Sequence, residues 1–267
     1  SAERVKPAAR RRLLLLVALA LVAAAAAVIL WLPPPGQTAV APLPLAYVGV
    51  RSCEECHAEE TRRWRGSHHD LAMQPADERT VLGDFDDAQL VHDGLTTRFF
   101  RKDGKAFVRT DGPDGRPADY PVAYVFGLAP LQQYLVELPG GRYQALSVAW
   151  DSRPKAEGGQ RWFHLYPGER VDHRDVLHWT KLSQNWNTQC AECHSTNLRK
   201  GYRPAEDRFQ TTFSEIDVSC EACHGPGSRH AEWAQRAKAR GQVPKGEPGL
   251  IVRFTERRSR EWEMDAE

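Results

Sequence analysis

The stretch "CEECHAEETRRWRGSHHD", residues 53–70, gathers two cysteines and three histidines within eighteen positions. Three kinds of site could use such a set: a zinc site, a disulfide framework or a covalent attachment site for haem. Its first five letters decide among them, because the same pattern returns twice further along the chain. The copies are "CEECH" at 53–57, "CAECH" at 190–194 and "CEACH" at 220–224, and together they contain all six cysteines.

Each copy reads Cys-x-x-Cys-His, and the histidine is what separates the three explanations. A structural zinc site takes four ligands, commonly two cysteine pairs, so three pairs would leave one pair without a partner. Disulfides form readily outside the cytoplasm, but they are indifferent to the residue that follows a cysteine. Haem explains every position, because two thiols bond the porphyrin and the adjacent histidine becomes an axial ligand of its iron.

We therefore predict three covalently attached haem c groups. Their thioether bonds would come from six cysteines, and their proximal iron ligands from the three histidines that close the motifs. The cysteines are Cys53, Cys56, Cys190, Cys193, Cys220 and Cys223, and the histidines are His57, His194 and His224.

Three six-coordinate irons need three further ligands on their distal faces. His230 follows His224 by only six residues, a reach of at most about 20 Å, so it is expected to serve a neighbouring haem. His68 is slightly favoured over His69, since adjacent residues of a helix face different directions. His178 stands in an aromatic setting that suits a haem pocket. The predicted distal ligands are His68, His178 and His230, with His69, His164 and Met73 in reserve.

A membrane anchor is predicted before the first motif. Residues 13–32, "LLLLVALALVAAAAAVILWL", carry no charge and are long enough to cross a bilayer as a helix. The basic segment before them places the N-terminus in the cytoplasm and the rest of the chain outside. A cleaved signal peptide is the alternative, but its apolar stretch would be shorter and would end at a small-x-small site. Because haem c is attached outside the cytoplasm, both inferences indicate a single-pass protein of the bacterial inner membrane, with a periplasmic haem domain.

The chain as a whole predicts an α+β fold, in which short helices and loops carry the motifs and a small antiparallel β domain interrupts them. Residues 53–80 look helical. Two hairpin signals follow, "KDGK" and "PGG", each between β-rich runs. The predicted segments are 1–12 (basic, cytoplasmic), 13–32 (anchor), 33–49 (proline-rich linker), 50–94 (first haem segment), 95–165 (antiparallel β region), 166–240 (second and third haem segment) and 241–267 (charged tail).

Several stretches resemble the multihaem c-type cytochromes related to the tetrahaem electron carrier of ammonia oxidisers. The most specific are "LHWTKLSQNWNTQCAECHSTNL" and "SCEACHGPGSRHAEWA", and with "YVGVRSCEECHAEETRRWRGSHHDLAMQ", "GRYQALSVAWD" and "WFHLYP" they cover most of residues 47–235. The closest likeness is to membrane-anchored bacterial members in which this module precedes tetratricopeptide repeats. The resemblance implies axial roles for His230 and His68. These 267 residues show three haem motifs rather than four, and no helical repeat.

These features predict a periplasmic triheme cytochrome that transfers electrons between redox partners of a respiratory chain. One alternative is a multihaem oxidoreductase of the nitrite or hydroxylamine type, which would leave one iron open to substrate. Another is a haem-bearing subunit of a larger respiratory complex. No Cys-x-x-Cys-Lys variant occurs and histidines are plentiful, so an electron carrier is favoured over a catalyst. The expected partners are redox proteins and the inner membrane, and the net charge of +1 gives no general attraction to nucleic acid.

Overall fold

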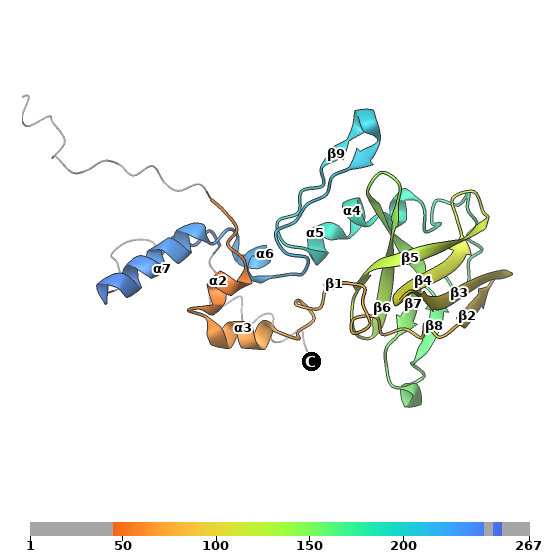
Figure 1. Cartoon of the computed structure of the whole chain (residues 1–267), viewed down its shortest axis with the longest axis horizontal. Coiled ribbons are helices and arrows are strands. Elements are labelled where there is room, and N and C mark those ends of the chain that lie inside the picture. Colours follow the sequence, from red (N-terminus) through yellow and green to blue (C-terminus); the bar gives the residue numbers. More distant parts are fainter. Residues whose placement is uncertain (1–44, 243–247, 253–267) are drawn as a thin grey trace, which may run out of the picture. The chain divides into compact units, whose positions relative to one another are not determined.

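The computed structural model describes residues 45–242 and 248–252. The predicted membrane anchor, residues 13–32, lies outside the described residues. None of the helices in the described part of the chain is long and apolar enough to cross a bilayer. Figure 1 follows the described elements along the chain, from the helices of the first motif through the sheet to those of the second and third motifs.

Eight strands form one antiparallel sheet between the first and the second motif. Seven of them follow one another as a meander from β2 to β8, and β1 pairs with β5. The α+β class is confirmed, but the sheet is larger than the small β domain that the sequence suggested. The strands are β1 (Met73–Pro75), β2 (Ala88–His92), β3 (Leu95–Lys102), β4 (Lys105–Asp111), β5 (Pro117–Phe126), β6 (Leu131–Leu138), β7 (Arg142–Asp151) and β8 (Arg161–His164).

Both hairpins predicted from turn residues are present. Asp103 and Gly104 join β3 to β4, and their φ values of 51° and 74° are the positive values that a tight two-residue hairpin turn requires. Gly140 and Gly141 join β6 to β7 with φ values of 79° and 67°. Glycine adopts this left-handed backbone without steric cost, so the glycines of both turns favour the hairpins that the sequence predicted.

Short helices carry the haem motifs. The expectation of helix over residues 53–80 is wrong beyond Trp64, where a helix ends. The chain then turns at Gly66, whose φ of 74° a right-handed helix cannot contain, and it enters β1 instead. A helix starts at Ser228, directly after "GPG". The helices are α2 (Val50–Glu54), α3 (Ala58–Trp64), α4 (Trp186–Gln189), α5 (Ala191–His194), α6 (Cys220–His224) and α7 (Ser228–Arg240).

The meander curls until strands far apart in its order meet across an apolar core. Phe99 on β3 stacks on Trp162 on β8, with ring centroids 3.5 Å apart and planes 4° from parallel. Phe85, which precedes β2, meets Trp162 edge-on, with ring centroids 5.4 Å apart, and also contacts the ring of Tyr134 on β6. This first core is therefore enclosed by the inner face of the curled sheet.

A second core covers the opposite face of β6 and β7. Leu135 and Ala145 belong to this second core. The next residue on each strand, Val136 or Leu146, faces the first core, because side chains alternate between the two faces of a strand. Trp186, the first residue of α4, is fully buried against this face. Because α4 runs directly into α5, the second haem motif is built onto the sheet.

Asn187 secures α4 to the hairpin between β6 and β7. Its side-chain oxygen accepts the backbone N–H of Tyr143 at 2.9 Å, and its side-chain nitrogen donates to the carbonyl of Gly141 at 3.1 Å. The amide is fully buried, so these bonds satisfy groups that would otherwise be costly to bury. The residues before the second motif thus have structural partners in the sheet.

The stacked pair in the first core gives a test of the fold. Phe99→Ala should lower the free energy of unfolding by about 3–5 kcal/mol, because the side chain is fully buried and its loss opens a cavity beside Trp162. Phe100 lies on the other face of β3 and is partly exposed, so Phe100→Ala should cost less than about 1.5 kcal/mol. Denaturant unfolding of both variants measures the difference, and equal losses would contradict the core described here.

Candidate haem-binding site

The first and third motifs lie against each other, although the whole sheet separates them in sequence. Helices α2 and α6 are in contact, and the thiols of Cys53 and Cys220 share a hydrogen bond. This bond lowers the pKa of Cys220 to about 7, whereas the bond together with burial raises the pKa of Cys53. The first cysteines of two motifs therefore meet at one wall of the site.

Glu221, inside the third motif, holds this contact together. Its side chain is buried, and its carboxylate accepts the backbone N–H groups of Val48, Gly49 and Gly227 at 3.0, 2.8 and 2.7 Å. Val48 and Gly49 lead into α2, whereas Gly227 follows α6. One carboxylate thus ties the approach to the first motif onto the third motif and onto the turn after it.

The second motif is joined to the third by residues beside each of them. Thr196 donates its hydroxyl to the carbonyl of Asp217 at 2.8 Å and accepts the backbone N–H of Ser219 at 3.0 Å. Ser219 directly precedes Cys220, and Thr196 is fully buried. The structure thus brings the second and third motifs together, and the first motif lies against the third.

A cavity of about 560 Å³ lies between the first and third motifs. His57 and His230 line it, and their ring centroids lie 6.1 Å apart with the ring planes 29° from parallel. The ring of Trp233 stacks on His230 at 5.7 Å. The buried indole nitrogen of Trp233 has no hydrogen-bond partner among the described residues. The volume falls within the range of cofactor pockets.

The separation of the two imidazoles fits an iron between them. A metal–imidazole bond is about 2 Å long. An imidazole ring, with bonds of about 1.33 Å, has a radius of roughly 1.1 Å. Two axial imidazoles on one iron therefore place their centroids about 6 Å apart, close to the 6.1 Å between His57 and His230. His230 thus lies beside His57, the histidine of the first motif.

Backbone carbonyls orient two of the candidate iron ligands. The Nδ1 atom of His230 donates to the carbonyl of Pro248 at 2.8 Å, and Nδ1 of His194 donates to the carbonyl of Ala72 at 3.0 Å. A carbonyl can only accept, so Nδ1 carries the proton and Nε2 keeps the lone pair that a metal needs. Burial lowers the pKa of His224, which favours the same neutral form.

Residues 248–252 close one side of the cavity. The backbone N–H of Val252 donates to the carbonyl of His224 at 3.2 Å, and Ile251 lies against Gly225, where a β-carbon would come within 3.2 Å of its side chain. Leu250 also lines the cavity. No pattern in the sequence indicated this role, because residues 248–252 lie within the segment 241–267, which was predicted only to be a charged tail.

The turn that carries His68 and His69 lies between the second and third motifs. The carbonyl of His69 accepts the backbone N–H of Val218 at 3.1 Å, two residues before Cys220. The carbonyl of Ala72, a few residues later, holds the ring of His194. Both histidine side chains of the turn are exposed.

The structure places the other three distal candidates in or beside the sheet. His178 is 3% exposed, its Nε2 atom lies 3.0 Å from the carboxylate of Asp111 and its Nδ1 atom 2.8 Å from the hydroxyl of Thr180. Both nitrogens are engaged, so this geometry leaves neither for an iron. His164 lies in β8, and Met73 is fully buried in the second core. The aromatic setting that suggested a haem pocket around His178 belongs to the first core.

Three carboxylates gather behind the third motif. Burial raises the pKa of Asp217 to about 7, and the nearby charges of Glu215 and Asp70 contribute to the same shift. The Oδ1 atom of Asp217 has no hydrogen-bond partner among the described residues. Because this pKa lies above the ordinary value, the carboxyl favours the folded state at low pH and loses that contribution as the pH rises through about 7.

Comparison with protein families matches residues 52–89 and 150–225 to the family described as cytochrome c554 and c-prime. These two ranges contain all three motifs. The chain is a multihaem c-type cytochrome. The resemblance drawn from the sequence is therefore confirmed, and the protein is a haem-bearing electron-transfer cytochrome with redox proteins as partners. Cytochromes of this type function outside the cytoplasm. No curated protein and no solved structure matches the chain.

The family match leaves out residues 90–149, which form most of the sheet of this cytochrome. The match resumes at Trp150, near the end of β7, and continues through the second and third motifs. The haem-binding segments are therefore in the shared part of the chain. Strands β3 to β6 lie outside the family match, whereas β1 and β8 lie inside it.

The bonds of Glu221 give a test of how the first and third motifs are held together. Glu221→Gln should lower the free energy of unfolding of the haem-loaded protein by about 2–4 kcal/mol, because a neutral amide replaces a buried acceptor of three N–H groups. Glu54 occupies the same place in the first motif but pairs with Arg65 near the surface, at 2.7 Å. Glu54→Gln should therefore cost less than about 1 kcal/mol. Similar losses in both variants would contradict the role given to Glu221.

Proposed function

We propose that this cytochrome carries three covalent haem c groups and transfers electrons at the outer face of the bacterial inner membrane, anchored by residues 13–32. The number follows from three complete Cys-x-x-Cys-His motifs. The observation that carries the proposal is the pair formed by His57 and His230, whose ring centroids lie 6.1 Å apart where both residues line a cavity bounded by two motifs.

The haem groups supply one-electron chemistry when bound, and the chain supplies attachment, orientation and exclusion of water. The six motif cysteines would hold the porphyrin edges, while His57, His194 and His224 would bind the irons from the proximal side. The carbonyls of Ala72 and Pro248 fix the rings of His194 and His230 through Nδ1. The contact between the first and third motifs keeps two attachment sites close, as electron transfer requires.

His230 is assigned as the distal partner of His57, rather than of His224 in its own segment. The sequence predicted that His230, only six residues after His224, would serve a neighbouring haem. The assignment agrees with this, because the helix that starts at Ser228 places His230 beside His57 of the first motif. His68, with His69 as its alternative, is assigned to one of the other two irons. The turn that carries both residues lies beside the third motif, and the chain just after it contacts His194 of the second.

One observation favours a second function. Because both nitrogens of His178 are engaged within the sheet, His68 and His230 alone would remain from the predicted distal set of three. One iron would then keep an open face, as in a multihaem oxidoreductase that binds a small substrate there. A high-spin signal in the ferric spectrum of the purified protein would favour this function, and a wholly low-spin spectrum would favour the electron carrier.

Haem stoichiometry tests the proposal directly. The intact mass should exceed that of the polypeptide by three haems, and the excess should survive extraction with acidified acetone, because thioether bonds resist it. Replacing Cys220 and Cys223 by alanine should remove one haem, and the matched pair Cys190 and Cys193 should remove another. A polypeptide of unmodified mass that binds zinc would refute the haem assignment.

Substitution of His230 tests the axial assignment. His230→Ala should open one iron and produce a high-spin ferric signal, whereas His230→Met should keep that iron six-coordinate and raise its reduction potential, since a thioether favours ferrous iron. His173→Ala, a histidine placed outside the cavity between the motifs, is the matched control and should leave the spectrum unchanged. A wholly low-spin spectrum for His230→Ala would reject the assignment.

A further inference from the structure

The end of β5 reaches the second haem motif, although the family match leaves this strand out. Phe126 is the last residue of β5 and Gly127 follows it, so both lie in the unmatched stretch 90–149. The ring of Phe126 meets the ring of His194 edge-on, with centroids 5.5 Å apart and planes at 81°. A strand outside the shared part of the chain thus contacts the histidine that closes the second motif.

The same end of β5 holds the hydrogen-bond acceptor of this imidazole in place. The carbonyl of Ala72 accepts from Nδ1 of His194 at 3.0 Å and from the backbone N–H of Gly127 at 3.2 Å. Ala72 is buried, and the next residue, Met73, pairs in register with Phe126. The carbonyl is therefore fixed by the pairing of β1 with β5, and the sheet orients the ring through it.

Apolar side chains surround the contact between the strand and the motif. Phe126 is 7% exposed, and Met73 and Trp186 are fully buried beside it in the second core. Cys190, the first attachment cysteine of the motif, packs against the same core. The second motif is thus backed by a dry region of the sheet. Solvent access and hydrogen bonds to the axial ligand are two of the properties that set the potential of a bound haem.

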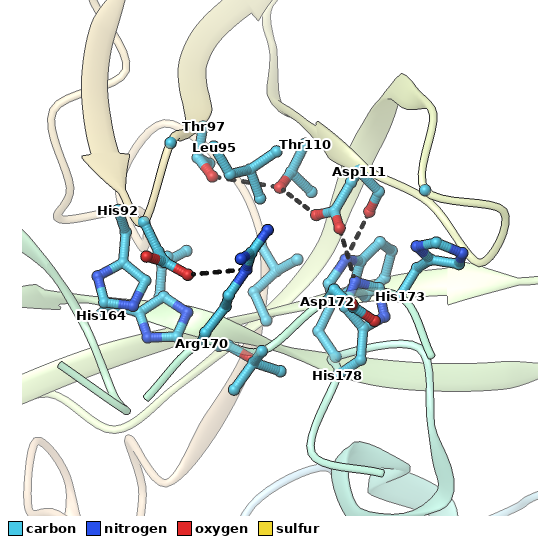
Figure 2. A pocket seen from close by; sticks show the side chains of 18 residues that line it. His92, Leu95, Thr97, Thr110, Asp111, His164, Arg170, Asp172, His173 and His178 are labelled. Carbon is cyan, nitrogen blue, oxygen red and sulfur yellow. Dashed lines mark hydrogen bonds and ion pairs between the residues drawn. The ribbon is translucent and has the colours of Figure 1, made fainter. Parts of the chain in front are cut away.

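The sheet uses its other histidines differently. Figure 2 shows His178 directed at Asp111, where Nε2 lies 3.0 Å from the carboxylate, and His92 beside His164. The rings of His92 and His164 stack with centroids 3.9 Å apart. These three histidines lie outside the motifs and are engaged within the sheet or the loop after it. His194, by contrast, connects the sheet to a haem attachment site.

We propose that Phe126 is a positioning residue for His194, through which the sheet raises the reduction potential of the haem on the second motif. This inference rests on the proposed haem at that motif. Phe126 keeps the imidazole against the carbonyl of Ala72 and excludes water from it. Ferric iron carries one more positive charge than ferrous iron, so a dry setting favours the ferrous state. Reduction is a one-electron step in which no bond of the chain forms or breaks.

Reductive titration of the haem-loaded protein, followed at the haem absorption bands, tests the role of Phe126. Phe126→Leu keeps the site apolar but removes the ring that packs on the imidazole. One haem should become harder to reduce, with its reduction equilibrium shifted at least about threefold, which is roughly 28 mV for one electron. The ferric EPR signal of the same haem should change as well. Unchanged potentials and EPR signals in folded Phe126→Leu would overturn the proposal.

Phe99→Leu is the matched control, because it separates positioning from a general loosening of the sheet. Phe99 is buried in the first core of the same sheet, away from the motif. Its replacement should destabilise the protein to a similar extent but leave every haem potential unchanged. An equal shift of potential in Phe99→Leu would show that the effect is not specific to Phe126, and would also overturn the proposal.

Removal of the second haem identifies the haem that responds. When Cys190 and Cys193 are replaced by alanine, adding Phe126→Leu should leave the remaining potentials unchanged. A shift that persists in this background would place the effect on another haem and reject the proposal. If the cysteine replacements remove no haem, the proposed function itself is refuted, and this inference with it.

Discussion

The arrangement of this cytochrome depends on one buried carboxylate. Glu221 accepts three backbone N–H groups, two from the chain that approaches the first motif and one from the turn after the third. A buried carboxylate is costly unless its oxygens are satisfied, and backbone donors satisfy them only in one relative position of the two segments. The contact of Cys53 with Cys220 and the cavity between the two motifs follow from that position.

The sheet plays a comparable part for the second motif. Trp186 is buried on its outer face, and Asn187 is bonded to the hairpin between β6 and β7 before the chain reaches the attachment cysteines. The inner face encloses a separate core, closed by the stack of Phe99 on Trp162. Both faces of β6 and β7 are buried. The outer face supports the segment that carries the second motif, and the inner face encloses the first core.

Imidazole orientation in this protein is set by the main chain. His194 and His230 each donate Nδ1–H to a carbonyl, from Ala72 and Pro248, in segments distant from them in sequence. Such bonds fix the tautomer and leave the lone pair on Nε2, and they survive most side-chain substitutions in the segments that supply the carbonyl. His178 shows the opposite case, since its two nitrogens are bonded to Asp111 and Thr180 and it serves the sheet instead.

The sequence by itself determined the attachment chemistry, because covalent haem needs Cys-x-x-Cys-His within five consecutive residues, and it determined both hairpins, because their turns need residues with positive φ. It also indicated that His230 would serve another haem, since six residues limit its reach. Only the tertiary structure decided that His230 lies beside His57, that Glu221 is buried and that His178 is bonded within the sheet. Glu54 and Glu221 occupy the same position in their motifs, yet Glu54 lies near the surface and Glu221 is buried. This difference could not be predicted from the motif, because the segments that bury Glu221 meet only in the folded chain.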